Sequence, residues 1–437
     1  MTELNPIPTL DNPKITRAWA FYDWANSSYA LVILSTIFPI YYSGITAGTQ
    51  VTLFGQMYEP KAVFGYSLTL SFLILVLLSP ILSAMADTRG NKLSFLKFFC
   101  TMGSVACMSM FFITDASRIV LCLLLSMIAN IGFYGSLVFY NAYLPEIASK
   151  DQQDALSARG FSLGYTGSLI ILCISLGLIM GVANDENRSF YTRLCFLITG
   201  IWWLGFAQYS FRFLPRGVAQ AASGLSLFNN IAASFKGIAH AGHTLFKTPN
   251  LNIFLGAFFF YSVGMQTIFV IATFIGDEIG LDDGKLILTI LCLQVEAIIG
   301  ALLLSRLSKK IGNRAVLILA VVFWIVACVA IYFLNKNNPN VQFQFYAIAG
   351  LVGLVMGGLQ SMSRSTYSKL LPQTDEPTTF FSFYDVLEKT SIIVGTFTYS
   401  TIVAQTGAVK PAALAMAAFF GIGLLFLFKL KNQSAPK

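Results

Sequence analysis

Ionisable side chains interrupt several long apolar stretches of this chain, and their chemistry has to be explained first. Asp23 lies in the stretch 17–42. Three polar neighbours, Tyr22, Asn26 and Tyr29, fall at i, i+4 and i+7 and share one stripe of a helix. Such a stripe offers hydroxyl, amide and carboxylate groups to a polar solute. The alternative is a structural gate contact in which Asp23 pairs with a basic residue, and both interpretations stay open.

Glu296 is the deepest single acid of the sequence, near the middle of the stretch 285–305. An ionised side chain at the centre of a membrane helix costs about 2.5–3.5 kcal/mol on insertion scales. A carboxyl group in such a place is suited to carrying a proton, and Asp23 is the second candidate for proton coupling. The alternative for Glu296 is a hydrogen bond between helices, for example to Lys389.

The stretch 379–403 contains a cluster of charges at Asp385, Glu388 and Lys389. Asp385 and Lys389 stand at i and i+4, so they can pair within one helix. We expect this cluster to neutralise itself and to hold a cytoplasmic gate.

Neutral amides and tyrosines in other apolar stretches can hydrogen-bond a polar solute, although they serve equally well between helices. The candidates for substrate binding, beyond the first stripe, are Asn141, Tyr165, Tyr261, Gln266, Gln294 and Gln360. Arg364, near the cytoplasmic end of the stretch 343–362, is a candidate for attracting an anionic group. A salt bridge in the gate is the preferred interpretation for Arg364, and Arg159 is assigned to the same gate.

The elements that must position these residues are membrane-spanning helices. Of the 437 residues 56% are hydrophobic and 11% are charged, and the mean hydropathy is +0.70. Ordinary soluble domains have about a quarter of their residues charged, so this composition indicates an all-α polytopic membrane protein. Twelve apolar stretches are long enough to span a bilayer. Their limits are 17–42, 62–85, 95–114, 118–143, 158–182, 192–211, 251–275, 285–305, 315–334, 343–362, 379–403 and 410–429.

The basic residues fall on alternate sides of these twelve spans with a strong bias. Most of the 28 Lys and Arg residues lie on the side that also holds both termini, which predicts that this side is cytoplasmic. We therefore expect a multi-pass protein of the cell inner membrane. The net charge of +8 reflects orientation and does not indicate a nucleic-acid partner. The expected partners are the lipid bilayer, a small-molecule solute and protons, and the expected state is a monomer.

The longest connection, 212–250, separates six spans from six. A weak amphipathic pattern around Leu225–Phe235 predicts that it lies along the membrane surface. It contains both histidines of the chain, His240 and His243, without carboxylate or cysteine company. The seven cysteines show no metal-ligand spacing, so neither a metal nor another cofactor is expected.

The two sets of six spans resemble each other at matching positions. The paired segments are 87–92 with 309–314, 140–145 with 367–372, and 22–27 with 261–266. A repeat in this register predicts a parallel duplication. The expected domains are an N-terminal half, 1–211, a cytoplasmic linker, 212–250, and a C-terminal half, 251–437.

Three motifs resemble those of a known family: Tyr-Asp-Trp-Ala-Asn-Ser-Ser-Tyr at 22–29, Arg-Gly-Phe-Ser-Leu-Gly-Tyr at 159–165 and Gly-Gly-Leu-Gln-Ser-Met-Ser-Arg-Ser at 357–365. Over nearly its whole length the chain resembles the bacterial members of the vacuole-effluxer-like (autophagy-related) family of the major facilitator superfamily. The resemblance implies the major facilitator fold, in which two six-helix halves rock around a central site.

The same resemblance implies a latch on the cytoplasmic side. Asp87 would keep that side closed through basic residues and the N-terminus of the eleventh span. The superfamily pattern after the second span is only partly kept, because Ser83 and Thr88 replace a glycine and a basic residue. Val263 stands where many relatives carry an acid, which argues against a coupling role for the seventh span.

The predicted function is secondary active transport of a small polar metabolite by alternating access, with proton coupling as a candidate mode. Amino-acid efflux is implied by resemblance to the fungal branch. No nucleotide-binding loop of the form G-x-x-x-x-G-K-[ST] and no set of catalytic groups is found in the sequence, so an enzyme is not expected. The alternatives are a non-transporting sensor or receptor on the same fold, or a carrier of another solute class such as sugars or drugs.

Overall fold

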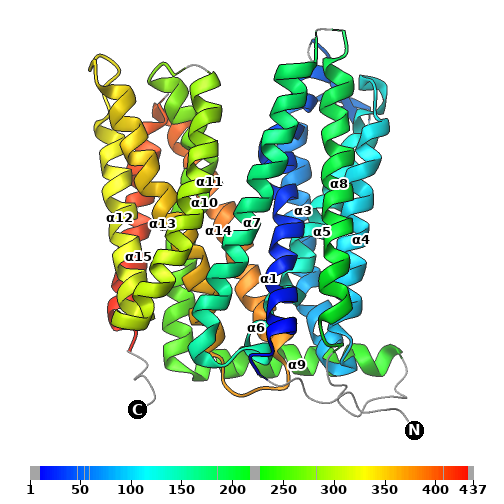
Figure 1. Ribbon diagram of the computed structural model, residues 1–437, viewed down its shortest axis with the longest axis vertical. Helices are drawn as coiled ribbons and strands as arrows, with labels where there is room; N and C mark the ends of the chain where they lie inside the picture. Colours follow the sequence, from blue (N-terminus) through cyan, green and yellow to red (C-terminus); the bar gives the residue numbers. More distant parts are fainter. Residues whose placement is uncertain are drawn as a thin grey trace. The chain divides into compact units, whose positions relative to one another are not determined.

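The computed structural model describes residues 10–46, 48–53, 55–58, 60–184, 186–216, 227–281, 283–406 and 408–431. Within these residues the chain is almost entirely helical (Figure 1). The only sheet among them is an antiparallel hairpin of two short strands, Val51–Leu53 (β1) and Gln56–Tyr58 (β2).

Eleven helical stretches of the described residues are long and apolar enough to cross a membrane. They correspond to eleven of the twelve predicted spans. The remaining predicted span, 379–403, forms the long helix α14 (Pro377–Thr406), which is not among the eleven. Three charged side chains in its middle, at Asp385, Glu388 and Lys389, lower its apolar character.

Contacts between residues divide the chain into two units. Within the described residues, unit 1 takes the chain as far as Ile147 and also Leu163–Ile238 and Glu376–Ser382. Unit 2 takes Ala148–Ser162, Ala239–Asp375 and the chain from Phe383 onward. Each unit therefore includes one short segment from the other half of the sequence.

Unit 1 is built from the helices of the first six predicted spans. Their bounds are α1 Pro13–Ser28, a π-helix Tyr29–Ile37, α2 Phe38–Ile45, α3 Pro60–Arg89, α4 Lys92–Ser109, 3-10 turns Met110–Phe112 and Ala116–Arg118, α5 Ile119–Asn141, α6 Leu144–Ile147, α7 Lys150–Leu176, a π-helix Gly177–Val182 and α8 Arg188–Phe213. The first part of α7 belongs to unit 2.

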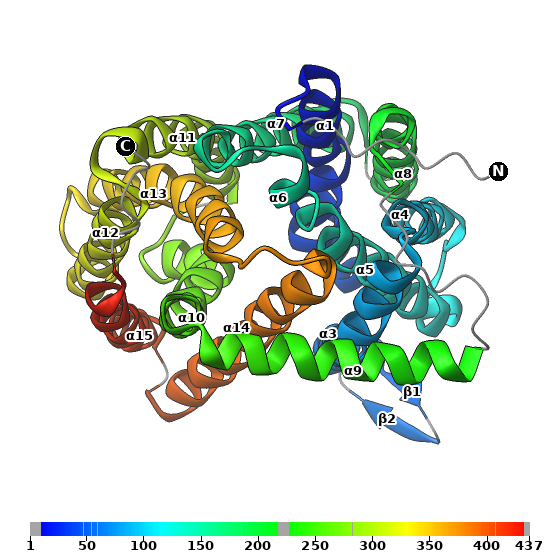
Figure 2. The ribbon, with the colours of Figure 1, turned by 90° about the horizontal axis from the view of Figure 1, so that it is seen from below.

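Unit 2 is built from the helices of the last six predicted spans. Besides α14, their bounds are α10 Pro249–Glu278, α11 Asp283–Ile311, α12 Asn313–Phe333, α13 Val341–Leu370 and α15 Lys410–Lys429. Helices α10, α12, α13 and α15 lie next to one another in the view of Figure 2.

The helix pairings of unit 1 recur in unit 2. In unit 1, α4 packs on α5, α1 on α8, α4 on α8 and α3 on α5. In unit 2, α12 packs on α13, α10 on α15, α12 on α15 and α11 on α13. Counted by span within each set of six, these are the same four pairs. The repeat that the sequence predicts is therefore present in the packing.

The connection between the two sets of spans contains helix α9 (Leu227–Lys247). It runs crosswise to the long helices of unit 1 (Figure 1). Ala241 and Leu245 are buried on one face, whereas Lys236, His240 and Lys247 are exposed. The amphipathic pattern that predicted a surface helix was placed around Leu225–Phe235. Leu225 lies outside the described residues.

The first span is not a regular α-helix throughout. Between Tyr29 and Ile37 the backbone forms a π-helix. Hydroxyl groups follow the same longer spacing, because Ser35 Oγ donates to the carbonyl of Ala30 and Thr36 Oγ1 donates to that of Leu31, both at 2.9 Å. Such wide turns are rare and are frequent at functional sites.

Glycines let neighbouring helices approach closely in both units. In unit 1 a Cβ atom added to Gly132 of α5 would lie only 2.7 Å from the carbonyl oxygen of Phe99 in α4. In unit 2 a Cβ atom on Gly357 of α13 would lie 2.8 Å from the backbone carbon of Ala297 in α11. Van der Waals contact at small residues is a main source of helix association in membranes.

We expect Gly132→Val to destabilise the protein by about 1–3 kcal/mol, because the added atoms overpack the contact between α4 and α5. Thermal unfolding of the purified protein in detergent measures the effect. Gly205→Val in α8 is the control, since no atom lies within 4 Å of an added Cβ atom there. Equal losses in the two variants would contradict the packing argument.

Candidate functional site

Asp87 of α3 binds the first turn of α14 within unit 1. Its Oδ1 accepts a hydrogen bond from the backbone N–H of Thr378 at 3.2 Å, and its Oδ2 accepts from the N–H and the hydroxyl of Thr379 at 2.7 and 2.8 Å. Asp87 is buried. A carboxylate at the N-terminus of a helix satisfies free N–H groups and favours the helix dipole. The contact expected from the sequence is thus present, and its role as a gate stays a prediction.

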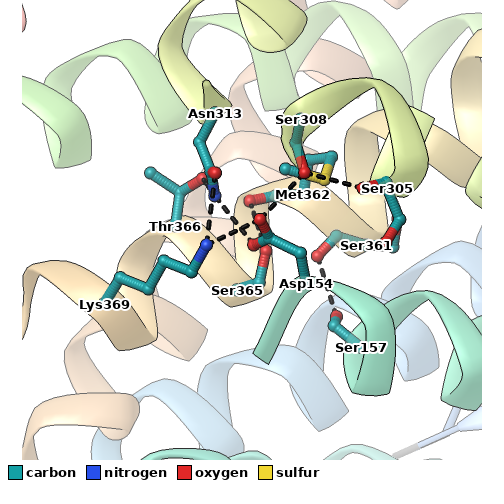
Figure 3. A network of polar contacts seen from close by, with 10 residues as sticks. All are labelled: Asp154, Ser157, Ser305, Ser308, Asn313, Ser361, Met362, Ser365, Thr366 and Lys369. Carbon is teal, nitrogen blue, oxygen red and sulfur yellow. Dashed lines mark hydrogen bonds and ion pairs between the residues drawn. The ribbon is translucent and has the colours of Figure 1, made fainter. Parts of the chain in front are cut away.

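Asp154 of α7 is the centre of a polar network within unit 2 (Figure 3). Lys369 Nζ of α13 lies 2.6 Å from Asp154 Oδ2. Ser308 Oγ of α11 donates to the same oxygen at 2.9 Å, and Asn313 Nδ2 of α12 donates to Asp154 Oδ1 at 2.8 Å. Asn313 Nδ2 also donates to Thr366 Oγ1 at 3.0 Å. The network joins the first part of α7 to three helices of unit 2.

Arg364 of α13 reinforces the same junction. Its Nε donates to Ser157 Oγ at 3.0 Å, and its Nη2 donates to the carbonyl of Ser157 at 2.9 Å. The guanidinium also lies over the ring of Phe161, 4.1 Å from the centroid. Arg159, assigned to the gate together with Arg364, is exposed, and its side chain forms no hydrogen bond or ion pair among the described residues.

Sequence reasoning did not single out Asp154, Ser308, Asn313 or Lys369 as a site. Asp154 lies in the polar run that opens α7, and such a run is normally a solvated helix end. Its burial depends on three other helices, which no local pattern reveals. The one available signal was the spacing of Asp154, Ser157 and Phe161, which places them on one helix face.

The stripe of the first span lies in the packed interior of unit 1. The ring of Tyr22 lies 5.1 Å from that of Tyr140, measured between centroids, and the ring of Tyr29 lies 5.4 Å from that of Trp203. Asp23 accepts a hydrogen bond of 2.8 Å from the hydroxyl of Tyr140. This carboxylate therefore joins α1 to α5.

Asn26, in the same stripe, is fully buried. Its Oδ1 lies 3.3 Å from the hydroxyl of Ser27, which can donate to it. Its Nδ2 has no hydrogen-bond partner among the described residues. An amide N–H group without a partner is costly in a membrane-spanning helix.

The predicted binding residues of unit 2 are only partly brought together. Tyr261 Oη and Ser363 Oγ lie 2.6 Å apart, which joins α10 to α13. Gln266 Nε2 of α10 donates to Glu388 Oε1 of α14 at 3.2 Å. Gln294 is buried in α11. Gln360 of α13 is half-buried, as are two candidates of unit 1, Asn141 and Tyr165.

Glu296 of α11 lies against two glycines of α13. A Cβ atom added to Gly350 would lie 3.1 Å from Glu296 Oε1, and one added to Gly353 would lie 2.8 Å from the Cβ of Glu296. The side chain is half-buried, and it forms no hydrogen bond or ion pair among the described residues. Among the described residues no hydrogen bond joins Glu296 to Lys389, and the alternative of a hydrogen bond between helices stays a prediction.

Lys389, which is fully buried, forms an ion pair with Asp385 within α14. The pairing at i and i+4 is the one that the sequence predicts. Lys389 Nζ also lies 3.5 Å from Glu388 Oε2. One ammonium group thus serves two carboxylates, and these three residues are the only charged ones in the sequence of α14.

Long apolar helices, four helix pairings that recur in both units and buried polar groups inside the spans are the features of a polytopic membrane protein with the major facilitator fold. Comparison with known proteins agrees. The model of the family described as "Vacuole effluxer Atg22 like" matches residues 11–437. The chain belongs to this family, as its motifs predicted, and the members of this superfamily are transporters rather than enzymes.

Among curated proteins, the chain is 30% identical to the uncharacterized MFS-type transporter YxiO of Bacillus subtilis, over 97% of this chain and 96% of the relative. It is 22% identical to autophagy-related protein 22 of Pyricularia oryzae, over 92% of this chain and 74% of the relative.

Solved structures show the same fold. The proton:xylose symporter XylE superimposes with a TM-score of 0.75 at 12% identity, covering 96% of each chain. The transporter FucP in its outward conformation gives 0.66 at 14% identity, covering 97% of this chain and 99% of that chain. The predicted fold class, an all-α polytopic membrane protein with the major facilitator fold, is confirmed.

We expect Asp154→Ala to destabilise the protein by about 3 kcal/mol, because the ammonium group of Lys369 loses its carboxylate in a largely buried place. Thermal unfolding in detergent measures the change. Asp151→Ala is the matched control, since Asp151 is exposed in the same helix. The double variant Asp154→Ala/Lys369→Met should recover part of the loss. No difference between the variants at 154 and 151 would show that the network contributes little.

Proposed function

We propose that the protein is a secondary active transporter that moves a small polar metabolite by alternating access. The observation that carries the proposal is the unpartnered Nδ2 of Asn26, fully buried in the family motif of the first span. Leaving such a group without a partner is costly in a membrane protein. A polar solute with a hydrogen-bond acceptor satisfies it.

An amino acid is the proposed solute class. The family is described as a vacuole effluxer family, which supports export, and the polar side chains inside the spans include amides, hydroxyls and carboxylates. Groups of this kind pair with the carboxylate and the ammonium of an amino acid.

The proposed cycle needs contacts that break and form again. Unit 2 includes Ala148–Ser162 from the first half of the sequence, and unit 1 includes Glu376–Ser382 from the second half. These segments are held by Asp154 and Asp87 through hydrogen bonds and one ion pair. The proposed moving bodies are the halves 1–211 and 251–437, connected by 212–250.

Glu296 is the proposed site of proton coupling, with Asp23 as the second candidate. Among the described residues no base forms an ion pair with Glu296, so its ionised form is costly in an apolar span. Protonation removes that cost. Asp23 has a hydrogen bond from Tyr140, which stabilises its ionised form, and this makes it the weaker candidate.

Solute exchange in liposomes tests the proposed transport. The purified full chain is reconstituted, amino acids found in a thermal-shift screen are loaded inside, and entry of labelled solute is followed. We expect counterflow of at least one amino acid. Counterflow of sugars alone would overturn the proposed solute class, and no flux of any solute despite solute-dependent stabilisation would favour a sensor.

The coupling role is tested with Glu296→Gln in the same liposomes. Exchange without a gradient should persist, because it needs no net proton movement, whereas accumulation driven by a pH gradient should fall about tenfold or more. Asp23→Asn is measured in parallel, and Glu278→Gln is the matched control because Glu278 is near the end of α10. Gradient-driven accumulation that persists in Glu296→Gln would contradict the assignment.

We also propose that both termini are cytoplasmic in the cell membrane, because most basic residues lie on their side of the spans. A bacterial alkaline phosphatase fused to the C-terminus should be inactive, whereas a green fluorescent protein in the same place should fluoresce. The opposite pair of results would invert the orientation.

A further inference from the structure

The charged cluster of α14 has one carboxylate more than it has bases. Lys389 is 0% exposed and pairs with Asp385, and its Nζ is also 3.5 Å from Glu388 Oε2. All three residues belong to unit 2. With both carboxylates ionised, the cluster carries one excess negative charge inside a membrane-spanning helix.

The direct hydrogen-bond and ion-pair partners of the two carboxylates do not neutralise this excess. Gln266 Nε2 donates to Glu388 Oε1 at 3.2 Å, and an amide carries no net charge. Asp385 Oδ2 is buried and has no hydrogen-bond partner among the described residues. Asp385 is 4% exposed. This carboxylate oxygen thus has an unused capacity to accept a hydrogen bond.

One side chain of the cluster is partly exposed. The side chain of Glu388 is 26% exposed, whereas those of Asp385 and Lys389 are almost or fully buried. Packing contacts hold this part of α14 against α10. Tyr384 stacks on Phe258 of α10 with centroids 4.0 Å apart, and Gly395 allows α14 to approach the carbonyl of Val263. Glu388 is therefore the more exposed of the two carboxylates of the cluster.

We propose that the α14 cluster binds one monovalent cation at Glu388 and Asp385, either a proton or the ammonium group of the transported solute. A single positive charge neutralises the excess and removes the cost of an unpaired buried charge. A divalent ion would overcompensate, and it normally takes six or more oxygen ligands. The described residues contain no group of three His, Cys, Asp or Glu side chains that would hold a metal ion.

The inference rests on the proposed transport function for its biological meaning. A bound proton makes the cluster a second protonation site beside Glu296, and a bound ammonium group gives the transported solute a positive charge. Other ionisable groups near the cluster are Tyr261 of α10, Arg364 and Tyr367 of α13, and Tyr384 of α14. Among these groups and the cluster, the carboxylates are the side chains that ordinarily titrate between acid and neutral pH.

Thermal unfolding of the purified full chain in detergent tests the site without knowledge of the solute. One series varies the pH in a buffer of N-methylglucamine chloride. A second series, at a fixed alkaline pH, replaces N-methylglucamine by methylammonium at constant ionic strength. Both are run on the wild type, Glu388→Gln, Asp385→Asn and the control Glu278→Gln. A ligand that binds the folded state raises the unfolding temperature.

If the cation is a proton, the unfolding temperature of the wild type falls as the pH rises, because the folded cluster loses a bound proton. Glu388→Gln and Asp385→Asn lose this dependence, since each leaves one carboxylate for one ammonium. If the cation is an ammonium group, methylammonium stabilises the wild type by a few degrees, and both variants bind it at least about tenfold more weakly. Glu278→Gln, which loses contacts with Val409 and Lys410, keeps the wild-type response to methylammonium and the part of the pH response that comes from the cluster.

The inference is overturned if neither acidification nor methylammonium stabilises the wild type more than the two cluster variants. Two variants keep the test decisive should one of them fail to fold. Solute flux is measured separately, so the outcomes are distinguishable: flux without cation-dependent stability removes the cation site, and cation-dependent stability without flux of any solute removes the transport function.

Discussion

A polar atom inside a lipid bilayer has no water to bind, so it must find its partner within the protein. This constraint explains why the buried polar groups of both units occur as joined sets. Asp23 accepts a hydrogen bond from the hydroxyl of Tyr140. Asp154 is paired with an ammonium group and accepts hydrogen bonds from an amide and a hydroxyl, and Lys389 lies close to two carboxylates. The atoms left over, such as Nδ2 of Asn26, mark the places where the requirement is not met internally.

Each unit includes one segment from the other half of the sequence, and the two segments are held by different kinds of polar contact. Asp87 belongs to α3 and accepts two hydrogen bonds from backbone N–H groups of the incoming segment and one from the hydroxyl of Thr379. Asp154 belongs to the incoming segment itself and binds side chains of three helices. The first contact depends mainly on the N-terminus of a helix, and the second depends on particular side chains. Duplicated helix packing has thus acquired unlike polar contacts in its two halves.

The sequence predicted the parts of this structure that depend on local patterns. The spans follow from apolar length, the repeat follows from matching segments, and the pair of Asp385 with Lys389 follows from helical spacing. The polar stripe of α1 was also predicted, but its neighbours were not, because only the fold decides that Tyr22 packs against Tyr140. The network around Asp154 was missed for the same reason, since its partners are far along the chain.

The π-helix of the first span has a consequence for any residue-by-residue survey of that span. Each turn of a π-helix takes in more residues than an α-turn, so the faces of the helix before Tyr29 and after Ile37 are out of phase. A substitution scan along the span would therefore show two separate periodic patterns instead of one. An alignment by spacing alone would assign the second pattern to the wrong side of the helix.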